Sequence, residues 1–283
     1  MFITFFAAML VTNDVALITF VPITLVIGRK SNISMMKIVI FETLAANLGS
    51  ALTPMGNPQN LFIYSFYNIT PKEFFSITLP LSFLSIVFLL IIIFKEKNKN
   101  LNFNLEDIKL GSKYKISIFT ILMIIVLLSV FHIIDYKIAF IITIITVFIV
   151  NKRLFLKVDI YLLLTFVGFF IFIGNISNMN IVKEFMESLL NSKTSTYILG
   201  LLSSQIISNV PATMLLSSFT NYYKELLLAV NIGGLGTLIA SLASIISYKF
   251  YVKENKEETK KYIICFTLYN LIGLSIFGVI FML

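Results

Sequence analysis

The sequence predicts an all-α polytopic membrane protein built as an inverted repeat, in which each half contains a re-entrant helical hairpin and a broken transmembrane helix. Three observations support this fold class. Hydrophobic residues make up 58% of the 283 residues and charged residues only 13%, and the mean hydropathy is +0.95. Several nearly uncharged windows are long enough to cross a hydrocarbon core of about 30 Å as helices. Polar interruptions recur in the same order in both halves.

The first half, residues 1–94, opens with a segment that is too polar at its centre to be an ordinary span. Residues 1–10 are apolar, residues 11–14 read Val-Thr-Asn-Asp, and residues 15–27 are apolar again. Arms of this length reach only about 16 to 20 Å as helix, so each ends near mid-membrane. Because unpaired backbone is costly in lipid, we predict a re-entrant hairpin over residues 1–28.

A broken helix is predicted over residues 35–68, and an unbroken helix over 74–94 completes this half. The break coincides with the stretch TPMGNPQN, residues 53–60. Pro54 and Pro58 remove backbone donors and free carbonyls one turn upstream. Gly56 allows close approach or unusual dihedral angles.

The second half repeats this order after a charged linker, residues 95–115, which we expect to be cytoplasmic. Its elements are predicted as helices over 116–131, 138–150 and 160–174, an interfacial amphipathic helix over 181–190, a re-entrant hairpin over 196–220, a broken helix over 225–248 and a last helix over 261–283. The aligned residues are Asn47, Gly49, Thr53 and Asn57 in the first half and Asn231, Gly233, Thr237 and Ser241 in the second. The chain therefore contains an internal repeat.

The distribution of Lys and Arg gives the expected orientation. Most of the basic residues fall in the loops near Arg29, in 95–115, in 152–157 and in 249–261. Basic loops remain on the cytoplasmic side, so hairpin 1–28 opens inward, hairpin 196–220 opens outward, and the C-terminus lies outside. We expect a multi-pass protein of the cell's inner (plasma) membrane. The net charge of +8 is then a membrane feature, and no nucleic acid is expected as a partner, because no aromatic platform accompanies the charges.

Enzyme signatures are absent from the sequence. It has no G-x-S-x-G, no H-E-x-x-H and no phosphate-binding glycine loop. One Cys and one His cannot build a metal cluster. We expect no enzyme activity and no cofactor beyond a coupling ion, Na⁺ or H⁺.

The two hairpin tips are the first candidate binding residues. They are Thr12, Asn13 and Asp14 in the first half and Ser208, Asn209 and Val210 in the second. Such residues cap helices, but a helix N-terminus at mid-membrane also favours an anionic or polar ligand. Placing the Asp14 carboxylate in the membrane costs about 2.5 to 3.5 kcal/mol, so it is a candidate to carry a proton or help bind Na⁺. The alternative is that Asp14 only caps its helix and faces a water-filled vestibule.

The two breaks are the second candidate. Freed carbonyls together with the side chains of Thr53, Asn57 and Asn60 make an all-oxygen set suited to a hard monovalent cation. A proline kink used only for packing is the alternative. The second break, residues 233–237, has no proline, so the alternative that its glycines serve only helix packing is stronger there.

These hairpin tips and the GNPQN and GGLGT elements together resemble the ion transporter superfamily, which includes citrate transporters, divalent anion:sodium symporters, arsenite permeases and sodium:proton antiporters. The match covers nearly the whole chain. The resemblance implies that Thr12, Asn13, Ser208 and Asn209 contact substrate. The implied ion-coupling residues are Asp14, Thr53, Gly56, Asn57, Asn60, Gly236, Thr237 and Ser241, with Na⁺ held among Asn13, Gly56, Asn57, Asn209, Gly236 and Thr237.

Three departures from that group's pattern matter. Asp14 and Val210 replace the third, hydroxylated residue of both tips, which weakens the case for a dicarboxylate and favours the arsenite-permease and antiporter branches. GNPQN differs from the group's Gly-Thr-Pro-Pro-Asn, which leaves the ion open. The group also has about three scaffold helices before the first hairpin, so we expect a truncated gene model or a fragment.

The resulting hypothesis is a secondary active transporter of a small anion or oxyanion, carboxylate-like or arsenite-like, coupled to Na⁺ or H⁺ and working by an elevator or rocking motion. The expected partners are the lipid bilayer, the solute and, by resemblance, a second copy in a homodimer. The alternatives are a Na⁺/H⁺ antiporter of the same fold and a non-transporting membrane scaffold or sensor.

Overall fold

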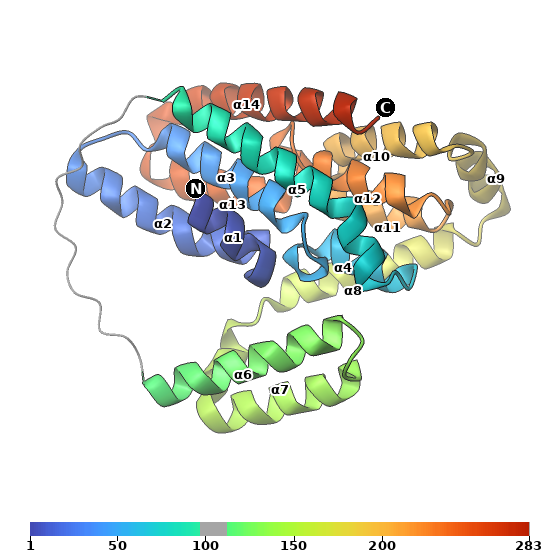
Figure 1. Cartoon of the computed structure of the whole chain (residues 1–283), viewed down its shortest axis with the longest axis horizontal. Coiled ribbons are helices and arrows are strands. Elements are labelled where there is room, and N and C mark those ends of the chain that lie inside the picture. The colour runs from blue at the N-terminus through green and yellow to red at the C-terminus, as the bar shows by residue number, and fades with distance from the viewer. Residues whose placement is uncertain (97–111, 283) are drawn as a thin grey trace. The chain divides into compact units, whose positions relative to one another are not determined.

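The computed structural model describes residues 1–96 and 112–282, and every regular element in that part of the chain is a helix (Figure 1). Most of the expected linker 95–115 lies outside the described residues. The predicted class, an all-α polytopic membrane protein, is confirmed.

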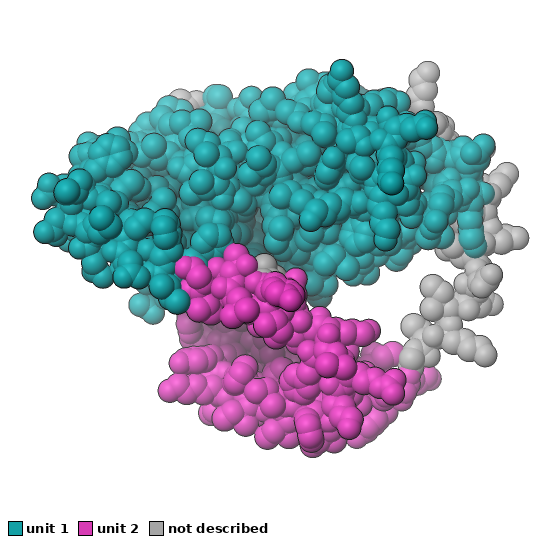
Figure 2. Space-filling model, turned by 180° about the vertical axis from the view of Figure 1, so that it is seen from behind, with its two compact units in different colours: residues 1–103, 169–283 teal, residues 104–168 magenta. Residues whose placement is uncertain are grey.

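The chain divides into two compact units (Figure 2), and the division does not follow the repeats. Unit 1 comprises Met1–Phe103 and Phe169–Leu283, and unit 2 comprises Asn104–Gly168. Unit 2 contains the packed helix pair α6 (Lys113–Val130) and α7 (Tyr136–Asn151), followed by η2 (Lys152–Lys157). Helix α8 (Ile160–Ile176) crosses the boundary between the units. Both hairpins and both broken helices therefore belong to unit 1.

The first-half elements of unit 1 are α1 (Phe2–Val11), α2 (Asn13–Ser31), α3 (Met36–Ser50), η1 (Pro54–Gly56), α4 (Pro58–Phe66) and α5 (Pro71–Phe94). Its second-half elements are α9 (Asn180–Leu189), α10 (Lys193–Ile207), α11 (Asn209–Ser217), α12 (Tyr223–Ile232), η3 (Leu238–Ala240), α13 (Leu242–Glu254), η4 (Lys256–Glu258) and α14 (Thr259–Ile280).

We call the end of unit 1 that carries Arg29, Lys37 and Lys253 the basic end. The end that carries Glu73 and Lys224 is the opposite end.

Each hairpin turns through a single residue with a positive φ angle. Thr12 has φ 75° between α1 and α2, and Ser208 has φ 73° between α10 and α11. Positive φ is uncommon for residues other than glycine, and such strain persists only where the surroundings enforce it. We refer to α1–Thr12–α2 as hairpin 1 and to α10–Ser208–α11 as hairpin 2.

Both breaks interrupt what would otherwise be one helix. In the first, α3 ends at Ser50, and α4 restarts at Pro58 with the Asn57 Oδ1 accepting from the Asn60 N–H at 2.8 Å. Proline is well placed there because the first helical N–H has no partner in any case. In the second, Gly236 has φ 106°, a conformation open to glycine without a Cβ penalty.

Four described helices are long and apolar enough to cross a membrane: Pro71–Phe94, Lys113–Val130, Tyr136–Lys157 and Lys256–Ile280. A fifth span results if Leu163–Ile176 and Asn180–Leu189, which meet at 96°, count as one. The apolar window around residues 226–248 is not one of them, because the second break divides it into α12 and α13.

A reciprocal exchange of side-chain hydrogen bonds joins the two broken helices. Asn231, before the second break, donates to Asn60 Oδ1 at 2.7 Å and accepts from Asn57 Nδ2 at 3.0 Å. Both of these partners follow the first break. In the aligned place, Asn47 donates to Ser244 Oγ at 3.2 Å and accepts from Ser241 Oγ at 3.1 Å.

These six side chains are buried, so their polar groups depend on one another rather than on water. Each repeat supplies the partners that the other repeat's asparagine needs. The two broken helices are therefore braced against each other at their centres.

The substitution Asn231→Leu tests this brace. It leaves the buried amides of Asn57 and Asn60 without Asn231, and an unpaired buried polar group costs about 1–3 kcal/mol. We expect the unfolding temperature of the purified protein in detergent to fall by several degrees. The control Asn175→Leu changes an exposed amide that bonds only within its own helix. Equal shifts for the two variants would contradict the brace.

Candidate functional site

The tip of hairpin 1 and the tip of hairpin 2 meet at the second break. Asn13 Nδ2 donates to Asn47 Oδ1 at 3.2 Å, and Asn47 Nδ2 lies 3.5 Å from the Gly234 carbonyl oxygen. On the other side, a Cβ added to Gly234 would lie 2.9 Å from Asn209 Nδ2. The two predicted tip asparagines thus lie on either side of Asn47 and Gly234.

At the first tip, Asn13 is only 4% exposed, and its Oδ1 accepts from the Asp14 backbone N–H at 2.9 Å. The Thr12 side chain accepts from the Val15 N–H at 3.4 Å. Asp14 is half-buried. Its carboxylate makes no hydrogen bond or ion pair with the described residues. It is a carboxylate at the α2 N-terminus that is available to a ligand or a proton.

The second tip is less polar. Asn209 is 3% exposed, and among residues 1–96 and 112–282 nothing hydrogen-bonds to its carboxamide. The Ser208 hydroxyl donates to the Ala240 carbonyl at 3.4 Å. Val210 takes the place of Asp14 and adds no polar atom. One tip therefore carries an acid and the other an apolar side chain.

The first break has its backbone carbonyls already engaged. Asn60 Nδ2 donates to the carbonyl oxygens of Ser50, Ala51 and Thr53 at 3.2, 3.2 and 3.0 Å. The Thr53 hydroxyl donates to the Met9 carbonyl at 2.5 Å. Gly56 lies against the Ser50 backbone, since an added Cβ would be 2.1 Å from the Ser50 oxygen. In this conformation an amide nitrogen occupies the position that a cation would share with these three oxygens.

The second break is held by a residue that the sequence analysis missed. Gln205, in the first arm of hairpin 2, donates from Nε2 to the Gly233 and Leu235 carbonyls at 2.7 and 2.9 Å. Its Oε1 accepts from the Thr237 N–H at 3.0 Å, and the Thr237 hydroxyl donates to the Gln205 carbonyl at 3.3 Å. An added Cβ on Gly236 would lie 2.2 Å from Gln205 Oε1. The available signal was a carboxamide three residues before the tip, inside an apolar arm.

The predicted residues thus fall into two groups. Asn13, Asn209 and Ser241 gather around Asn47 and Gly234. Thr53, Asn57 and Asn60 of the first break, and Gly236 and Thr237 of the second, instead complete the hydrogen bonding or packing of the breaks. The breaks are therefore internally satisfied, whereas at the tips Asp14 and the Asn209 carboxamide have no hydrogen-bond partner among the described residues.

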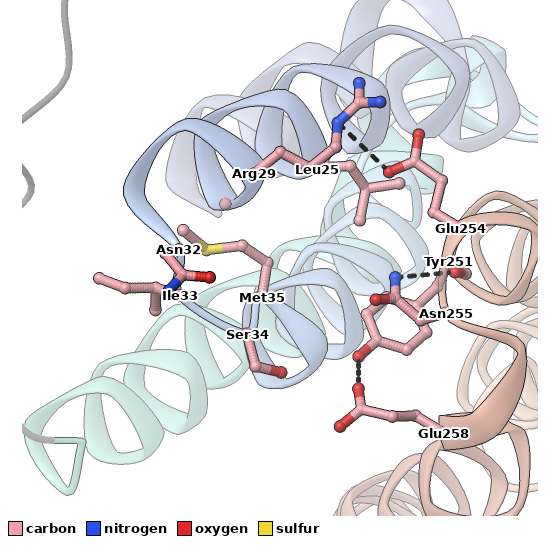
Figure 3. A pocket seen from close by; sticks show the side chains of 11 residues that line it. Leu25, Arg29, Asn32, Ile33, Ser34, Met35, Tyr251, Glu254, Asn255 and Glu258 are labelled. Carbon is pink, nitrogen blue, oxygen red and sulfur yellow. Dashed lines mark hydrogen bonds and ion pairs between the residues drawn. The ribbon is translucent and has the colours of Figure 1, made fainter.

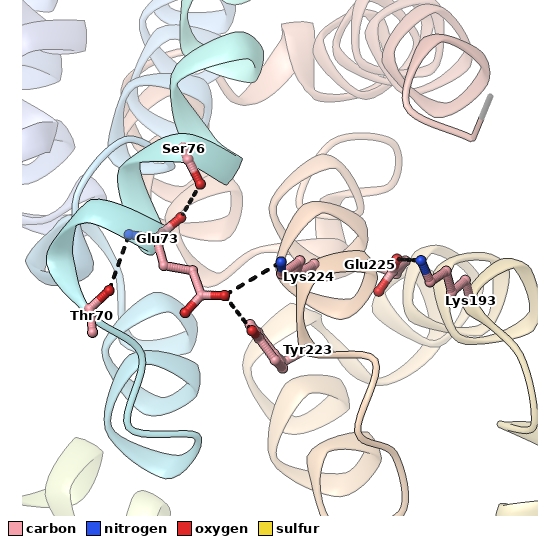
Figure 4. A network of polar contacts seen from close by, with 7 residues as sticks. All are labelled: Thr70, Glu73, Ser76, Lys193, Tyr223, Lys224 and Glu225. Atoms are coloured by element: carbon pink, nitrogen blue, oxygen red, sulfur yellow. Dashed lines mark hydrogen bonds and ion pairs between the residues drawn. The ribbon is translucent and has the colours of Figure 1, made fainter.

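Polar contacts at the opposite end of unit 1 fix the base of the second broken helix (Figure 4). Glu73, in the first turn of α5, accepts a hydrogen bond from Tyr223 and pairs with Lys224 at 3.4 Å. Lys193 of α10 pairs with Glu225 at 3.9 Å. These bonds tie α5, α10 and α12 together and so position hairpin 2.

A pocket of about 320 Å³ opens at the basic end, between the end of α2 and the end of α13 (Figure 3). Its lining includes Leu25, Arg29, Ser34, Tyr251 and Glu254. Arg29 Nε lies 3.6 Å from the Glu254 carboxylate. The pocket lies at the base of hairpin 1, away from the tips.

Comparison with known proteins places the chain among membrane transporters. A family model described as Citrate transporter (CitMHS) matches residues 1–221. An uncharacterized transporter of Methanocaldococcus jannaschii is 40% identical over 253 residues, 88% of this chain and 68% of that protein. The inner membrane protein YbiR of Escherichia coli is 30% identical over 256 residues, with the same two coverages.

A third relative, the putative transporter arsB of Dictyostelium discoideum, is 30% identical over 102 residues, which cover 35% of this chain and 18% of that protein. The predicted resemblance to the ion transporter superfamily is confirmed, and so is the transporter class. With a family match over most of its length and a long relative at 40% identity, this chain belongs to the CitMHS citrate transporter family.

Proposed function

We propose that this protein is a secondary active transporter that moves a small anion or oxyanion through a site between its two hairpin tips. The observation that carries the proposal is the convergence of Asn13 and Asn209 on Asn47 and Gly234. Both asparagines begin a helix, so backbone N–H groups and carboxamides face the same space. Family membership supports transport as the activity.

The tips favour a small solute with few oxygens. Val210 gives hairpin 2 an apolar side chain where hairpin 1 has Asp14, so the two tips cannot hold two equal carboxylate groups. An ionised Asp14 also repels an anion, which favours a weak acid that binds in its neutral form or together with a proton. An arsenite-like oxyanion satisfies both conditions better than a di- or tricarboxylate, and one relative is named as a putative arsB transporter.

For the coupling ion we favour H⁺ over Na⁺. A Na⁺ site at either break requires backbone oxygens that in this conformation accept hydrogen bonds from Asn60 and Gln205. Asp14 has no such partner among the described residues. A carboxylate at mid-membrane gains most from protonation, because desolvation penalises its charge.

For the transport motion we favour an elevator. A rocking motion of one repeat against the other would have to break the Asn47 and Asn231 exchange. Unit 1 moving as one body keeps this exchange intact. In this proposal the protein spans the inner (plasma) membrane with the basic end in the cytoplasm and the C-terminus outside, and the homodimer expected by resemblance would supply the stationary part.

A second candidate is cation/proton antiport without an anion substrate, and Asp14 is the observation that favours it. In this case Asp14 would bind Na⁺ and H⁺ alternately. Reconstituted vesicles distinguish the two functions. Antiport requires only Na⁺ on one side of the membrane and no added anion.

The tip asparagines give the first test. Asn13→Ala and Asn209→Ala each remove a carboxamide from the site, and a buried polar group of the solute left unpaired costs about 1–3 kcal/mol, or about tenfold in affinity. We expect arsenite or citrate flux into proteoliposomes to fall about tenfold in each variant. The control Asn178→Ala changes an exposed amide in the turn after α8 that bonds only to the Gly174 carbonyl and keeps full flux. Undiminished flux in both tip variants would count against the site.

Asp14 gives the second test. If Asp14 carries the coupling proton, the Asp14→Asn variant should no longer accumulate solute against its concentration gradient. It should still exchange solute when the concentrations on the two sides are equal. The measurement is vesicle uptake under an imposed pH gradient, repeated with choline in place of Na⁺. The control is Glu184→Gln, an exposed carboxylate on α9. Accumulation that follows the Na⁺ gradient and ignores the pH gradient would overturn proton coupling.

A further inference from the structure

We infer that the tip half of hairpin 1, residues 12–21, is the moving gate of the site, while Gln205 is a positioning residue that holds hairpin 2 to its break. The role of this segment as a gate rests on the proposed function. The inferred difference in mobility between the two hairpins is independent of that function, because it follows from contacts within unit 1. Three differences between the repeats carry the inference.

The first difference lies three residues before each tip. Gln205 makes three hydrogen bonds across the second break, to the Gly233 and Leu235 carbonyls and from the Thr237 N–H. The aligned residue of hairpin 1 is Met9, whose thioether can donate no hydrogen bond. Both repeats share one bond at this position, from a threonine hydroxyl to a backbone carbonyl. It joins Thr53 to Met9 in hairpin 1 and Thr237 to Gln205 in hairpin 2. Hairpin 1 thus lacks the side-chain clamp of hairpin 2.

The second difference is the position of proline in the returning arm. Pro22 lies inside α2, where it removes a backbone hydrogen bond and weakens the helix. Pro211 lies in the first turn of α11, where the N–H groups have no helical partner in any case. Beyond Pro22, the Thr24 hydroxyl anchors α2 by donating to Glu42 Oε1 of α3 at 2.7 Å. Pro22 therefore separates an anchored base from the tip half.

Few bonds hold that tip half. Within the described part of the chain, the one side-chain hydrogen bond from residues 12–21 to another element is Asn13 to Asn47. One face of the segment, with Val15 and Ile18, is about half exposed, whereas Ala16, Leu17 and Val21 on its other face are fully buried. The returning arm of hairpin 2, in contrast, buries most of its residues, among them Ala212, Met214 and Leu216. A small solute can replace the Asn13 bond with bonds of its own.

The third difference is at the hairpin bases. Tyr67, at the end of α4, donates to the Ser217 and Thr220 carbonyls at 3.0 and 2.8 Å and so clamps hairpin 2. Its aligned counterpart in the other repeat, Tyr251, donates to Glu258 and, among the described residues, hydrogen-bonds toward hairpin 1 only at the Ser34 side chain, which follows α2. The pocket in Figure 3 lies between Tyr251 and the end of α2. The base of hairpin 1 is joined to α13 by the Arg29 and Glu254 pair, whose side chains are 63% and 33% exposed, so solvent weakens it.

Distances between spin labels on cysteines test the inference without any substrate. In the full-length protein with Cys265→Ser, one pair is Ile18→Cys on α2 with Ile91→Cys on α5. The second pair is Ile207→Cys beside the hairpin 2 tip with Ile272→Cys on α14. All four positions are solvent- or lipid-exposed. We expect a broad or two-peaked distance distribution for the hairpin 1 pair and a single narrow one for the hairpin 2 pair.

Exchanging the clamp residues should exchange the behaviour. Met9→Gln gives hairpin 1 a carboxamide at the clamp position and narrows its distribution, whereas the matched control Met9→Leu leaves it broad. Gln205→Met broadens the hairpin 2 distribution. Should Gln205→Met fail to fold, the wild-type pairs and the Met9 variants still decide. Equal widths for the two wild-type pairs, or a hairpin 2 pair that is the broader, would overturn the inference.

A flux measurement then tests the gate separately. With the site proposed above, Met9→Gln slows the turnover of arsenite or citrate exchange severalfold and leaves the half-saturating concentration unchanged, because it stabilises the closed hairpin. Narrowed distances with unchanged turnover would overturn the gating role. Absence of flux in the wild type as well would instead count against the proposed substrates.

Discussion

The reciprocal bonding of Asn47 and Asn231 is the interaction on which the rest of unit 1 depends. Each asparagine stands before a break in its own repeat and bonds to residues that follow the break in the other repeat. A polar side chain inside a membrane protein requires a partner there, since lipid supplies none. The exchange meets that need for both repeats at once and holds the two broken helices against each other.

A break in a membrane helix creates free carbonyls as well as room for a ligand. In this protein a single carboxamide satisfies most of them at each break, Asn60 at the first and Gln205 at the second. In this conformation the carbonyls at both breaks therefore accept hydrogen bonds from side chains of the protein itself. At the tips, in contrast, the Asp14 carboxylate and the Asn209 carboxamide make no hydrogen bond with the described residues, whereas Asn13 bonds to Asn47.

The architecture is symmetric, whereas its chemistry is not. The tip residues Thr12 and Ser208 have nearly equal φ angles, and the bond of Thr53 to Met9 repeats as that of Thr237 to Gln205. The repeats differ in side chains, namely Asp14 against Val210, Met9 against Gln205, and the partners of Tyr67 and Tyr251. They differ in backbone at the second break, where Gly236 has φ 106°. The two hairpins therefore turn alike but carry different side chains at and beside their tips.

Hydrophobic periodicity and helix-breaking residues by themselves determined the all-α membrane class, the two hairpins, the first break and the candidate tips. Those features depend on local chemistry: apolar length, proline without an N–H, and polar residues that cannot face lipid. The second break was weaker in sequence because it has glycine without proline, yet Gly236 at φ 106° makes it as definite as the first.

Only the tertiary structure decided which side chain meets which carbonyl. Asn57 and Asn60 read as cation ligands in sequence, but packing brings Asn231 to them, and packing also carries Gln205 from hairpin 2 to the second break. These partners lie far apart along the chain, and no local pattern encodes a contact that arises when two helices cross. Sequence determined that polar groups interrupt the apolar segments, and the fold decided which of these groups bond to one another, because only crossing helices bring distant donors within hydrogen-bonding distance.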